Sequence, residues 1–525
     1  MFLSALKEFI FMSKILLVLS CLWCANLKAQ QTHSVENLAI DLSESAQVID
    51  NFGSSGCWFS EGIGKYWPVE KKEKIAQLLF SQTITKDGKL EGIGLSAWRF
   101  NIGAGTLEQG DSSGIKDFRK RADTFLNPDG TYNWNKQEGQ RFFLQKARDY
   151  GVGTLIAFSN SPPVYFTKNG LGYKTEKDFE SNLREDRYEA YAGFLADVIR
   201  HFDTQNIHFD YISAVNEPQW DWSKKYMEAD QEGSPWTNNQ IYKITKALNL
   251  ALEKAKLKTQ MLISEAGMLN YLYGGSGKAS NQIQNFFGKS SEHYVAQLSH
   301  MPKIIAGHSY FTETNEKTLV ETRRTLSDTA KRYGVKYWQS EYSMLADGFR
   351  EGTTGPRTAM DCALFLSKVI HTDLTVGNAT AWQFWNAYEP GNAKQNTRYY
   401  LIALQPQADF KDGEFTATKN LWALGHYSRF VRPGMTRLLT EMSNKELLVS
   451  AFKDNNGKLV LVITNYGTTD VKLQLTLKNA KKSLKTATTY LTSKEEGVDM
   501  KLMGKHNPLA VMTIQARSIQ TVLVD

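Results

Sequence analysis

Between residues 49 and 385, eight short apolar segments alternate with longer helical patterns. The interiors of these segments are mostly continuous and apolar, as in parallel strands that are buried on both faces. A strand–helix unit repeated eight times predicts an α/β fold, the (β/α)8 TIM barrel. A doubly wound open sheet is the alternative, but no Gly-x-Gly-x-x-Gly motif follows the first segment. The expected strands are residues 49–58, 95–102, 153–159, 209–215, 261–265, 304–309, 336–341 and 379–385.

Three of the intervening segments carry helical signals. Apolar residues in 191–199 recur at i, i+3, i+4, i+7 and i+8, which predicts one buried helix face. Asn135 and Glu138 have the spacing of a capping pair and predict the start of another helix. A third helix is expected over 317–333, with Gly334 as its stop.

The pattern changes after residue 424, where short alternating or apolar runs replace the strand–helix units. Residues 454–457, with the sequence Asp-Asn-Asn-Gly, form a turn signal between two of these runs. This pattern predicts an antiparallel β-sandwich. Residues 39–48, which precede the barrel, are expected to add a strand to this β-sandwich.

The N-terminus is typical of a secretory signal. Lys14 precedes a short apolar run at residues 15–23, and a polar stretch ending in the small residue Ala29 follows. The run is too short to span a bilayer comfortably, and no other segment resembles a membrane span. We therefore expect a secreted or periplasmic protein, or one anchored by a lipid at Cys21, with either Met1 or Met12 as its start. The expected domains are a signal peptide at 1–29, a segment joining the sandwich at 30–48, a barrel at 49–424 and a sandwich at 425–525.

Several functional classes are disfavoured by residue usage. Beyond the signal, Cys57 and Cys362 are the remaining cysteines, and two cysteines make neither a disulfide framework nor a zinc site. The nine histidines lack metal-binding spacing, so we expect no metal and no cofactor. The net charge of +7 is small for 525 residues, with scattered lysines, which argues against nucleic-acid binding. The oligomeric state stays open.

Two glutamates stand at the ends of predicted barrel strands, where active sites of this fold lie. The fourth segment ends in Asn216-Glu217-Pro218, and the seventh ends in Glu341. Each glutamate alone also fits a solvated loop charge or an ion pair. A pair of carboxylates at one barrel mouth fits hydrolysis of a glycosidic bond, because one protonates the leaving oxygen while the other attacks or stabilises the anomeric carbon.

Other motifs follow in a recognisable order. They lie at residues 98–103, 159–163, 211–222, 307–310 and 382–386. With Asn-Glu-Pro at 216–218 and Ser-Glu-Tyr at 340–342, they make the mature chain resemble glycoside hydrolase family 30. The resemblance implies a retaining glycosidase with a barrel, a C-terminal β-sandwich and an N-terminal strand joining it. It also implies that Glu217 is the acid/base and Glu341 the nucleophile.

The substrate expected from this resemblance is an oligo- or polysaccharide. The glycine-rich stretch 101–105 and the loop 219–222 are most similar to the endo-β-1,6-galactanase branch. β-1,6-Glucanases and xylanases of the same family are the alternatives. A carbohydrate-binding protein without catalysis is the alternative of another class, and the presence of both carboxylates argues against it.

Further residues at the strand ends are candidates for substrate binding. The resemblance implies that Asn216 binds the sugar 2-hydroxyl. Arg99 is expected either to keep Glu341 ionised or to form a structural ion pair. Tyr310 is expected to donate to the nucleophile or to pack as a core aromatic.

Tryptophans are candidates for stacking against sugar rings. Trp385 is expected to form the floor of the sugar-binding site. Trp382 lies three residues earlier on the same strand, so by strand alternation it faces the other way and belongs to the core. Trp220 and Trp222 follow Glu217 closely and fit either stacking platforms or core packing. His308 is expected to be a hydrogen-bonded histidine at a strand end.

Overall fold

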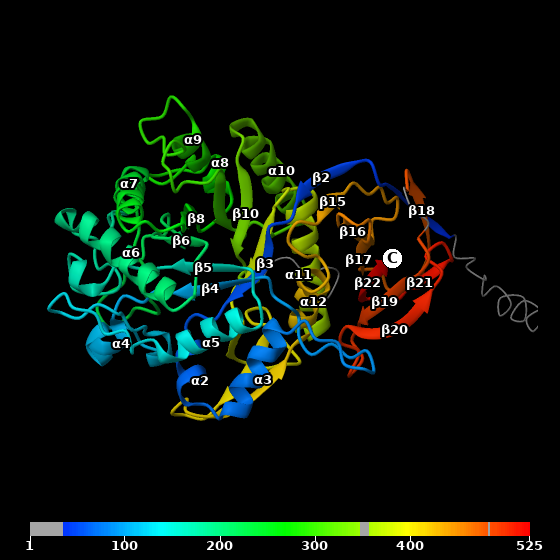
Figure 1. Cartoon of the computed structure of the whole chain (residues 1–525), viewed down its shortest axis with the longest axis horizontal. Helices are drawn as coiled ribbons and strands as arrows, with labels where there is room; N and C mark the ends of the chain where they lie inside the picture. Colours follow the sequence, from blue (N-terminus) through cyan, green and yellow to red (C-terminus); the bar gives the residue numbers. More distant parts are fainter. Residues whose placement is uncertain (1–34, 347–355, 481–483) are drawn as a thin grey trace, which may run out of the picture.

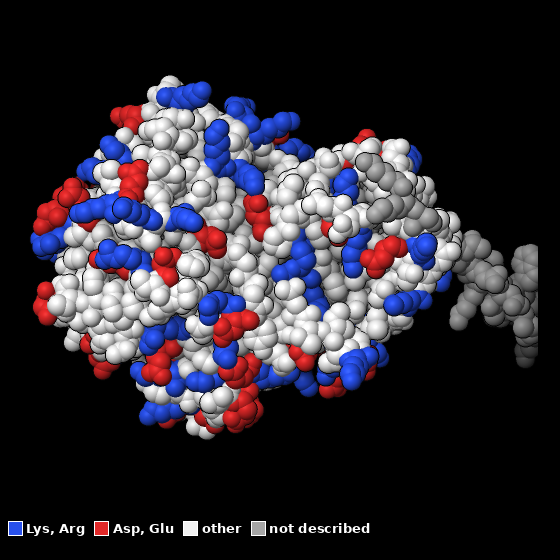
Figure 2. Space-filling view, viewed as in Figure 1, with Lys and Arg blue, Asp and Glu red and all other residues white. Residues whose placement is uncertain are grey.

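The computed structural model describes residues 35–346, 356–480 and 484–525 (Figure 1). The expected signal peptide, its cleavage site, the two candidate start residues and Cys21 lie outside the described residues. Within the described ranges, no helix combines the length and hydropathy needed to cross a membrane. On the face drawn in Figure 2, basic and acidic side chains are interspersed, as on an ordinary solvated surface.

The barrel predicted from the eight apolar segments is confirmed. Its strands pair in parallel in the order β7-β6-β5-β4-β3-β11-β10-β9-β8. β7 and β8 are two parts of the fifth strand. Between them, the Leu262 N–H donates to the β6 residue Ile212 and the Ile263 carbonyl accepts from the β9 residue Ala306, which closes the sheet. The strands are β3 (Asn51–Ser55), β4 (Ala97–Asn101), β5 (Thr154–Phe158), β6 (Tyr211–Ser213), β7 (Gln260–Met261), β8 (Ser264–Ala266), β9 (Ile304–His308), β10 (Lys336–Glu341) and β11 (Ala381–Phe384).

Two bulges interrupt this sheet where polar side chains enter the barrel mouth. The β8–β9 register shifts between Ser264 and Ala266, and Glu265 between them has a left-handed φ of 53°. The β10–β9 register shifts between Gln339 and Glu341. A bulge changes the direction of the side chains next to it, so these irregularities direct Glu265 and Glu341 toward the barrel centre.

Helices cover the outside of the barrel and bury their apolar stripes against it (Figure 1). The face predicted for residues 191–199 is buried in α6, and α10 ends at Gly334 with a φ of 65°, as expected. The long helices are α3 (Val69–Phe80), α5 (Glu138–Asp149), α6 (Tyr188–Thr204), α7 (Asn238–Lys254), α10 (Glu316–Tyr333), α11 (Ala359–Thr375) and α12 (Lys419–Ser428).

The capping pair predicted from Asn135 and Glu138 is wrong. Glu138 is the first residue of α5, and no side chain of the residue before it caps the helix. Instead, the Glu61 carboxylate of α2 (Ser60–Tyr66) accepts from the N–H groups of Gly139 and Gln140 at 3.1 and 3.3 Å. The free N–H groups of the first turn are therefore satisfied by a residue far away in the sequence.

A small sheet follows the last barrel strand and was not predicted. It consists of β12 (Tyr388–Pro390), β13 (Ile402–Pro406) and β14 (Gly413–Ala417). The expected boundary at residue 424 lies inside α12, the helix after this sheet. α12 contacts both domains, since His426 bonds to Thr521 and Thr492 of the sandwich while Ser428 donates to the Ile93 carbonyl.

The C-terminal domain is the expected β-sandwich (Figure 1). Its larger sheet has the order β2-β15-β16-β17-β22-β19-β20, and its smaller sheet the order β1-β18-β21. The N-terminal segment contributes to both, because β1 pairs in parallel with β18 and β2 pairs antiparallel with β15. The strands are β1 (Glu36–Asp41), β2 (Ser45–Val48), β15 (Thr436–Leu438), β16 (Leu447–Lys453), β17 (Leu459–Asn465), β18 (Val471–Lys478), β19 (Ala487–Thr492), β20 (Lys501–His506), β21 (Met512–Ile514) and β22 (Ser518–Val524).

Candidate active site

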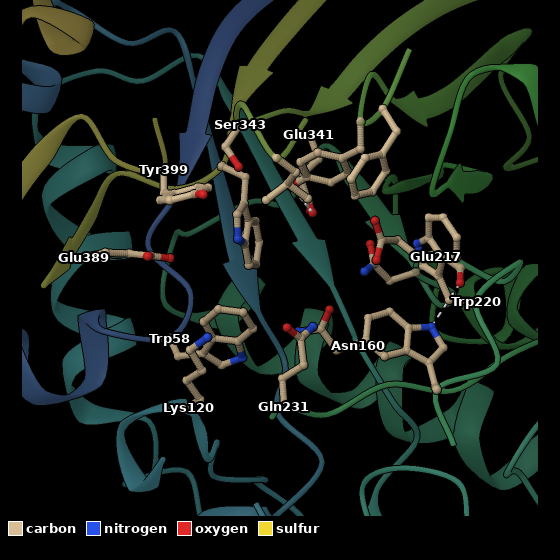
Figure 3. Close-up of a pocket in the computed structure, with 16 residues that line it drawn as sticks. Trp58, Lys120, Asn160, Glu217, Trp220, Gln231, Glu341, Ser343, Glu389 and Tyr399 are labelled. Carbon is tan, nitrogen blue, oxygen red and sulfur yellow. Dashed lines mark hydrogen bonds between the residues drawn. The ribbon is translucent and has the colours of Figure 1, made fainter. Parts of the chain in front are cut away.

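A cleft of about 440 Å³ opens at the barrel mouth, where the strands have their carboxyl ends (Figure 3). Both predicted glutamates, Glu217 and Glu341, line it. Aromatic side chains flank them on two sides. Trp220 lies near Glu217, together with Trp222, whose indole donates to the Glu217 carbonyl, and Phe311, which packs against Trp220. Trp58 and Tyr399 lie toward the other end, where Trp385 packs against Trp58.

Glu217 is held by its own backbone. It follows β6 with a left-handed φ of 46°, an uncommon conformation for a residue with a side chain. Its N–H donates to the Glu265 carbonyl at 2.8 Å, and its carbonyl accepts from the Trp222 indole at 3.0 Å. These bonds fix the turn that presents the carboxyl group to the cleft.

Glu341 is the last residue of β10, and both of its carboxylate oxygens have donors. Arg99 Nη1 of β4 lies 2.6 Å from Oε2, and the Tyr310 hydroxyl donates to Oε1 at 2.9 Å. Arg99 and Glu341 are both almost fully buried, so their ion pair is little screened by water. The two contacts expected for Arg99 and Tyr310 are therefore both present.

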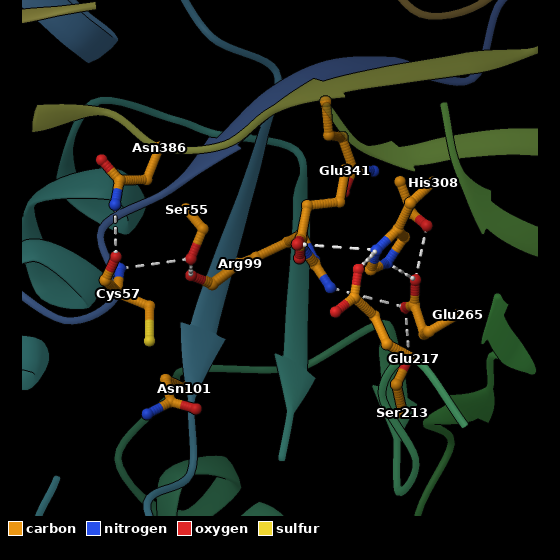
Figure 4. Close-up of polar contacts among 12 residues, drawn as sticks. Ser55, Cys57, Arg99, Asn101, Ser213, Glu217, Glu265, His308, Glu341 and Asn386 are labelled. Atoms are coloured by element: carbon orange, nitrogen blue, oxygen red, sulfur yellow. Dashed lines mark hydrogen bonds and ion pairs between the residues drawn. The ribbon is translucent and has the colours of Figure 1, made fainter. Parts of the chain in front are cut away.

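His308, at the end of β9, stands between the two glutamates (Figure 4). Its Nδ1 lies 2.9 Å from Glu217 Oε1 and 3.5 Å from Glu341 Oε1. One carboxylate oxygen of each glutamate and one ring nitrogen of the histidine all lie within 4.8 Å of one another. Carboxyl groups this close suit the retaining geometry, at roughly 5–5.5 Å, and leave too little room for the water of an inverting enzyme.

Glu265 is a third glutamate of the site, which sequence reasoning placed at a strand end without assigning it a role. It is completely buried and accepts hydrogen bonds from Ser213 Oγ, at 2.6 Å, and from Ser340 Oγ. His308 Nε2 lies 3.3 Å away and Arg99 Nη2 3.7 Å away (Figure 4). A charged residue ending an apolar strand was the available sequence signal.

The charges of this cluster determine where its protons reside. Burial opposes ionisation of Glu265, but the charge of Arg99 and hydrogen bonding to His308 lower its pKa to about 2. Burial also opposes a charge on His308, yet Glu341, Glu217 and Glu265 together raise the pKa of His308 to about 10. Two cations, Arg99 and His308, then balance two anions, Glu265 and Glu341.

The fifth ionisable group, Glu217, is shifted toward its protonated form. Burial raises the pKa of its carboxyl above the ordinary value of 4.5, and repulsion from Glu341 acts in the same direction, whereas His308 opposes both. A protonated Glu217 beside an ionised Glu341 is the arrangement that a glycosidase needs at the start of its reaction.

We predict that Glu265→Gln moves the basic limb of the kcat/KM–pH profile to lower pH by about one unit. Removing an anion makes every proton of the coupled Glu217–His308 pair easier to lose, so the acid form disappears at lower pH. The measurement is the pH profile of wild type and variant, with thermal unfolding followed at each pH. Glu189→Gln, on the exposed side of α6, is the matched control. An unchanged basic limb in Glu265→Gln would show that Glu265 does not set the protonation of the site.

Asn216 is nearly buried beside Glu217 and lines the cleft. Its Oδ1 has no hydrogen-bond partner among the described residues. A buried amide oxygen without a partner costs free energy in the empty site, and a substrate hydroxyl that donates to it would remove this cost.

The predicted tryptophans fall into the two expected groups. Trp382 is completely buried and its indole donates to Asp373 at 2.9 Å, as expected of a core residue. Trp220, Trp222 and Trp385 are partly exposed and line the cleft. A Cβ at Gly267 would lie 2.4 Å from the Trp220 indole nitrogen, so glycine at this position leaves space for the ring.

Glu217, His308 and Glu341 also have the proximity of a metal-ligand set. The chemistry of these groups does not favour a metal. Both oxygens of Glu341 already accept hydrogen bonds, from Arg99 and Tyr310, and both ring nitrogens of His308 lie within hydrogen-bond distance of a glutamate oxygen. The group is better suited to proton transfer.

Comparison with known proteins agrees with this geometry. The model of O-glycosyl hydrolase family 30 matches residues 35–399, and that of the family 30 β-sandwich domain matches residues 434–522. Endo-β-1,6-galactanase of Hypocrea rufa is 24% identical over 460 residues, which cover 84% of this chain and 83% of that protein. Glucuronoxylanase XynC of Bacillus subtilis (strain 168) is 23% identical over 352 residues, which cover 65% of this chain and 68% of that protein.

A solved structure resembles the whole described chain. The crystal structure of a conserved exported protein from Bacteroides fragilis has a TM-score of 0.86 and 32% sequence identity to this chain. The match covers 93% of this chain and 100% of the other. Because the family model covers more than half of the sequence, this chain belongs to glycoside hydrolase family 30 and is an O-glycosyl hydrolase.

Proposed function

We propose that this hydrolase cleaves β-1,6-linked galactan by a retaining double displacement, with Glu217 as acid/base and Glu341 as nucleophile. The observation that supports this most directly is the convergence of the two carboxyl groups in one cleft, bridged by His308. The different surroundings of the two glutamates support this division of roles. Burial raises the pKa of Glu217 and favours its acid form, while Glu341 is ion-paired with Arg99.

In the first step, Glu341 attacks the anomeric carbon and Glu217 gives its proton to the leaving oxygen. The C–O bond to the aglycone breaks, and a bond from Glu341 to the sugar forms. In the second step, Glu217 removes a proton from water, which attacks the same carbon and releases Glu341. The sugar keeps its anomeric configuration because two inversions occur.

The buried cluster keeps a constant net charge through this cycle. When Glu341 becomes an ester it loses its negative charge, and Glu217 gains one at the same time. His308 lies within reach of both groups and remains cationic, so its Nδ1–H can favour whichever carboxylate is ionised. A site that needs no large rearrangement of charge favours both half-reactions.

The choice of galactan rests on the relatives and is the finer part of the proposal. The endo-β-1,6-galactanase relative aligns over more of the chain than the glucuronoxylanase relative does. β-1,6-Glucan and xylan remain the competing substrates.

A panel of β-1,6-galactan, β-1,6-glucan and glucuronoxylan tests this proposal. We expect reducing ends to appear fastest with β-1,6-galactan, and oligosaccharides of several lengths to be released if the action is endo. Faster release of reducing ends from β-1,6-glucan or from glucuronoxylan would identify that glycan, and not galactan, as the substrate. Binding to a glycan without release of reducing ends from any of them would refute the hydrolase mechanism.

We also propose that the protein is exported, as a secreted, periplasmic or Cys21-anchored form. Support comes from the apolar run at residues 15–23 and from the related exported protein of Bacteroides fragilis. Cell fractionation and mass determination of the mature N-terminus check this. A cytoplasmic protein that retains residues 1–29 would contradict it.

A further inference from the structure

The end of the cleft away from Glu217 carries two opposite charges that the catalytic cluster does not use. Since Glu217 protonates the leaving group in the proposed mechanism, the aglycone lies on its side, near Trp220 (Figure 3) and near Trp222, whose indole bonds to the Glu217 carbonyl. The opposite end must then hold the glycone side of the substrate. Glu389, Lys120 and Tyr399 line this end, together with Trp58 and Trp385.

Glu389 reaches the cleft because of its position in β12. Side chains alternate along a strand, and its neighbour Tyr388 is completely buried and bonds to Ser60. Glu389 therefore points to the opposite side, toward the cleft (Figure 3). The small sheet that follows the barrel thus contributes a carboxyl group to the site.

One oxygen of Glu389 is fixed and the other is available. The Asn386 amide donates to the Cys57 carbonyl at 2.8 Å and to Glu389 Oε1 at 3.0 Å, which uses both of its hydrogens. Asn386 is itself completely buried. Among the described residues, no hydrogen bond is found to Glu389 Oε2, so this oxygen can accept from a sugar hydroxyl.

Lys120 supplies a donor at the same end. Its Nζ lies 4.9 Å from the centre of the Trp58 ring, over the aromatic face. Trp58 in turn packs edge-on against Trp385, with ring centres 5.2 Å apart. Lys120 and Glu389 interact electrostatically, and no ion pair between them is found among the described residues. A gap with a donor on one side, an acceptor on the other and aromatic rings nearby suits a sugar ring.

We propose that Glu389 and Lys120 form a glycone-side subsite that binds hydroxyl groups of a neutral sugar and disfavours a uronate. This inference rests on the proposed function and sharpens its substrate class to neutral glycans. Glu389 accepts from hydroxyls, Lys120 donates to them, and the ionised carboxylate repels the acidic branch that a glucuronoxylan carries.

The test compares wild type, Glu389→Gln and Lys120→Met on β-1,6-linked galacto-oligosaccharides and on glucuronoxylan. Burial raises the pKa of Glu389 to about 7, despite the charge of Lys120 and the bond from Asn386. Assays should therefore run at about pH 7.5, where the carboxyl is mainly ionised. Glu189→Gln is the control for loss of a glutamate elsewhere, and thermal unfolding of each variant checks the fold.

We expect Glu389→Gln to lower kcat/KM on the neutral oligosaccharides about 10- to 100-fold, mainly through KM. Its relative activity on glucuronoxylan should rise, because the repulsive charge is gone. Lys120→Met should also weaken binding of the neutral oligosaccharides. Titration calorimetry of the galacto-oligosaccharides against Glu341→Gln and Glu341→Gln/Glu389→Gln measures the same loss as a fall in affinity, without turnover.

The outcomes separate this inference from the proposed function. If wild type cleaves β-linked glycans and Glu389→Gln has unchanged KM, affinity and substrate preference, the subsite is wrong and the hydrolase function stands. If Lys120→Met loses only activity on glucuronoxylan, Lys120 binds a uronate and the neutral subsite is wrong. If wild type cleaves none of the glycans, the proposed function itself fails.

Discussion

Glu341→Ala is expected to lower kcat at least about 10⁴-fold, which corresponds to about 5 kcal/mol of activation free energy. The variant lacks the atom that forms the glycosyl-enzyme, so neither half-reaction can proceed by the normal route. It also leaves Arg99 without its closest anion in a buried position. The measurement is kcat on an aryl β-glycoside, for which the exposed Glu321→Ala in α10 is the control.

Azide separates loss of the nucleophile from loss of the fold. Replacement by alanine leaves a space beside the anomeric carbon, which a small anion can enter next to Arg99. With an activated aryl β-glycoside, azide should restore turnover and give the α-glycosyl azide, because a single displacement inverts the configuration. Full activity without azide, or a β-glycosyl azide, would show that Glu341 is not the nucleophile.

The strand order of the barrel and the convergence of Glu217 and Glu341 in one cleft were predictable because they depend on local patterns. Most barrel strands lie in predominantly apolar segments, and the side chains at their carboxyl ends reach the active site in this fold. Glu217 and Glu341 lie at the ends of two of these segments. The division of roles between Trp382 and Trp385 also followed from strand alternation alone.

The features that were missed depend on contacts between distant residues. The cap of α5 is supplied by Glu61, which lies on another helix, so no local spacing reveals it. Glu265 acquires its role from Arg99, His308 and a bulge whose register appears only in the folded sheet. Glu389 belongs to a short strand after the barrel, and its orientation depends on pairing with β13.

Glu217→Ala is expected to have an effect that depends on the leaving group. For a substrate with a poor leaving group, such as a sugar hydroxyl, loss of the general acid should lower kcat/KM about 10³- to 10⁴-fold. For a dinitrophenyl glycoside, whose leaving group needs no proton, formation of the glycosyl-enzyme should be little affected. Rates measured with a series of aryl glycosides check this dependence, with the exposed Glu228→Ala as the control.

Hydrolysis of the intermediate should slow in Glu217→Ala because no base activates water. The dinitrophenyl glycoside should therefore give a burst of phenolate followed by a slow steady state. Azide, which needs no base, should speed this second step and give the β-glycosyl azide, the opposite anomer to that expected from Glu341→Ala. The basic limb of the kcat/KM–pH profile should also disappear, because Glu217 is the group whose proton it reports. Equal losses with good and poor leaving groups would remove Glu217 from the acid/base role.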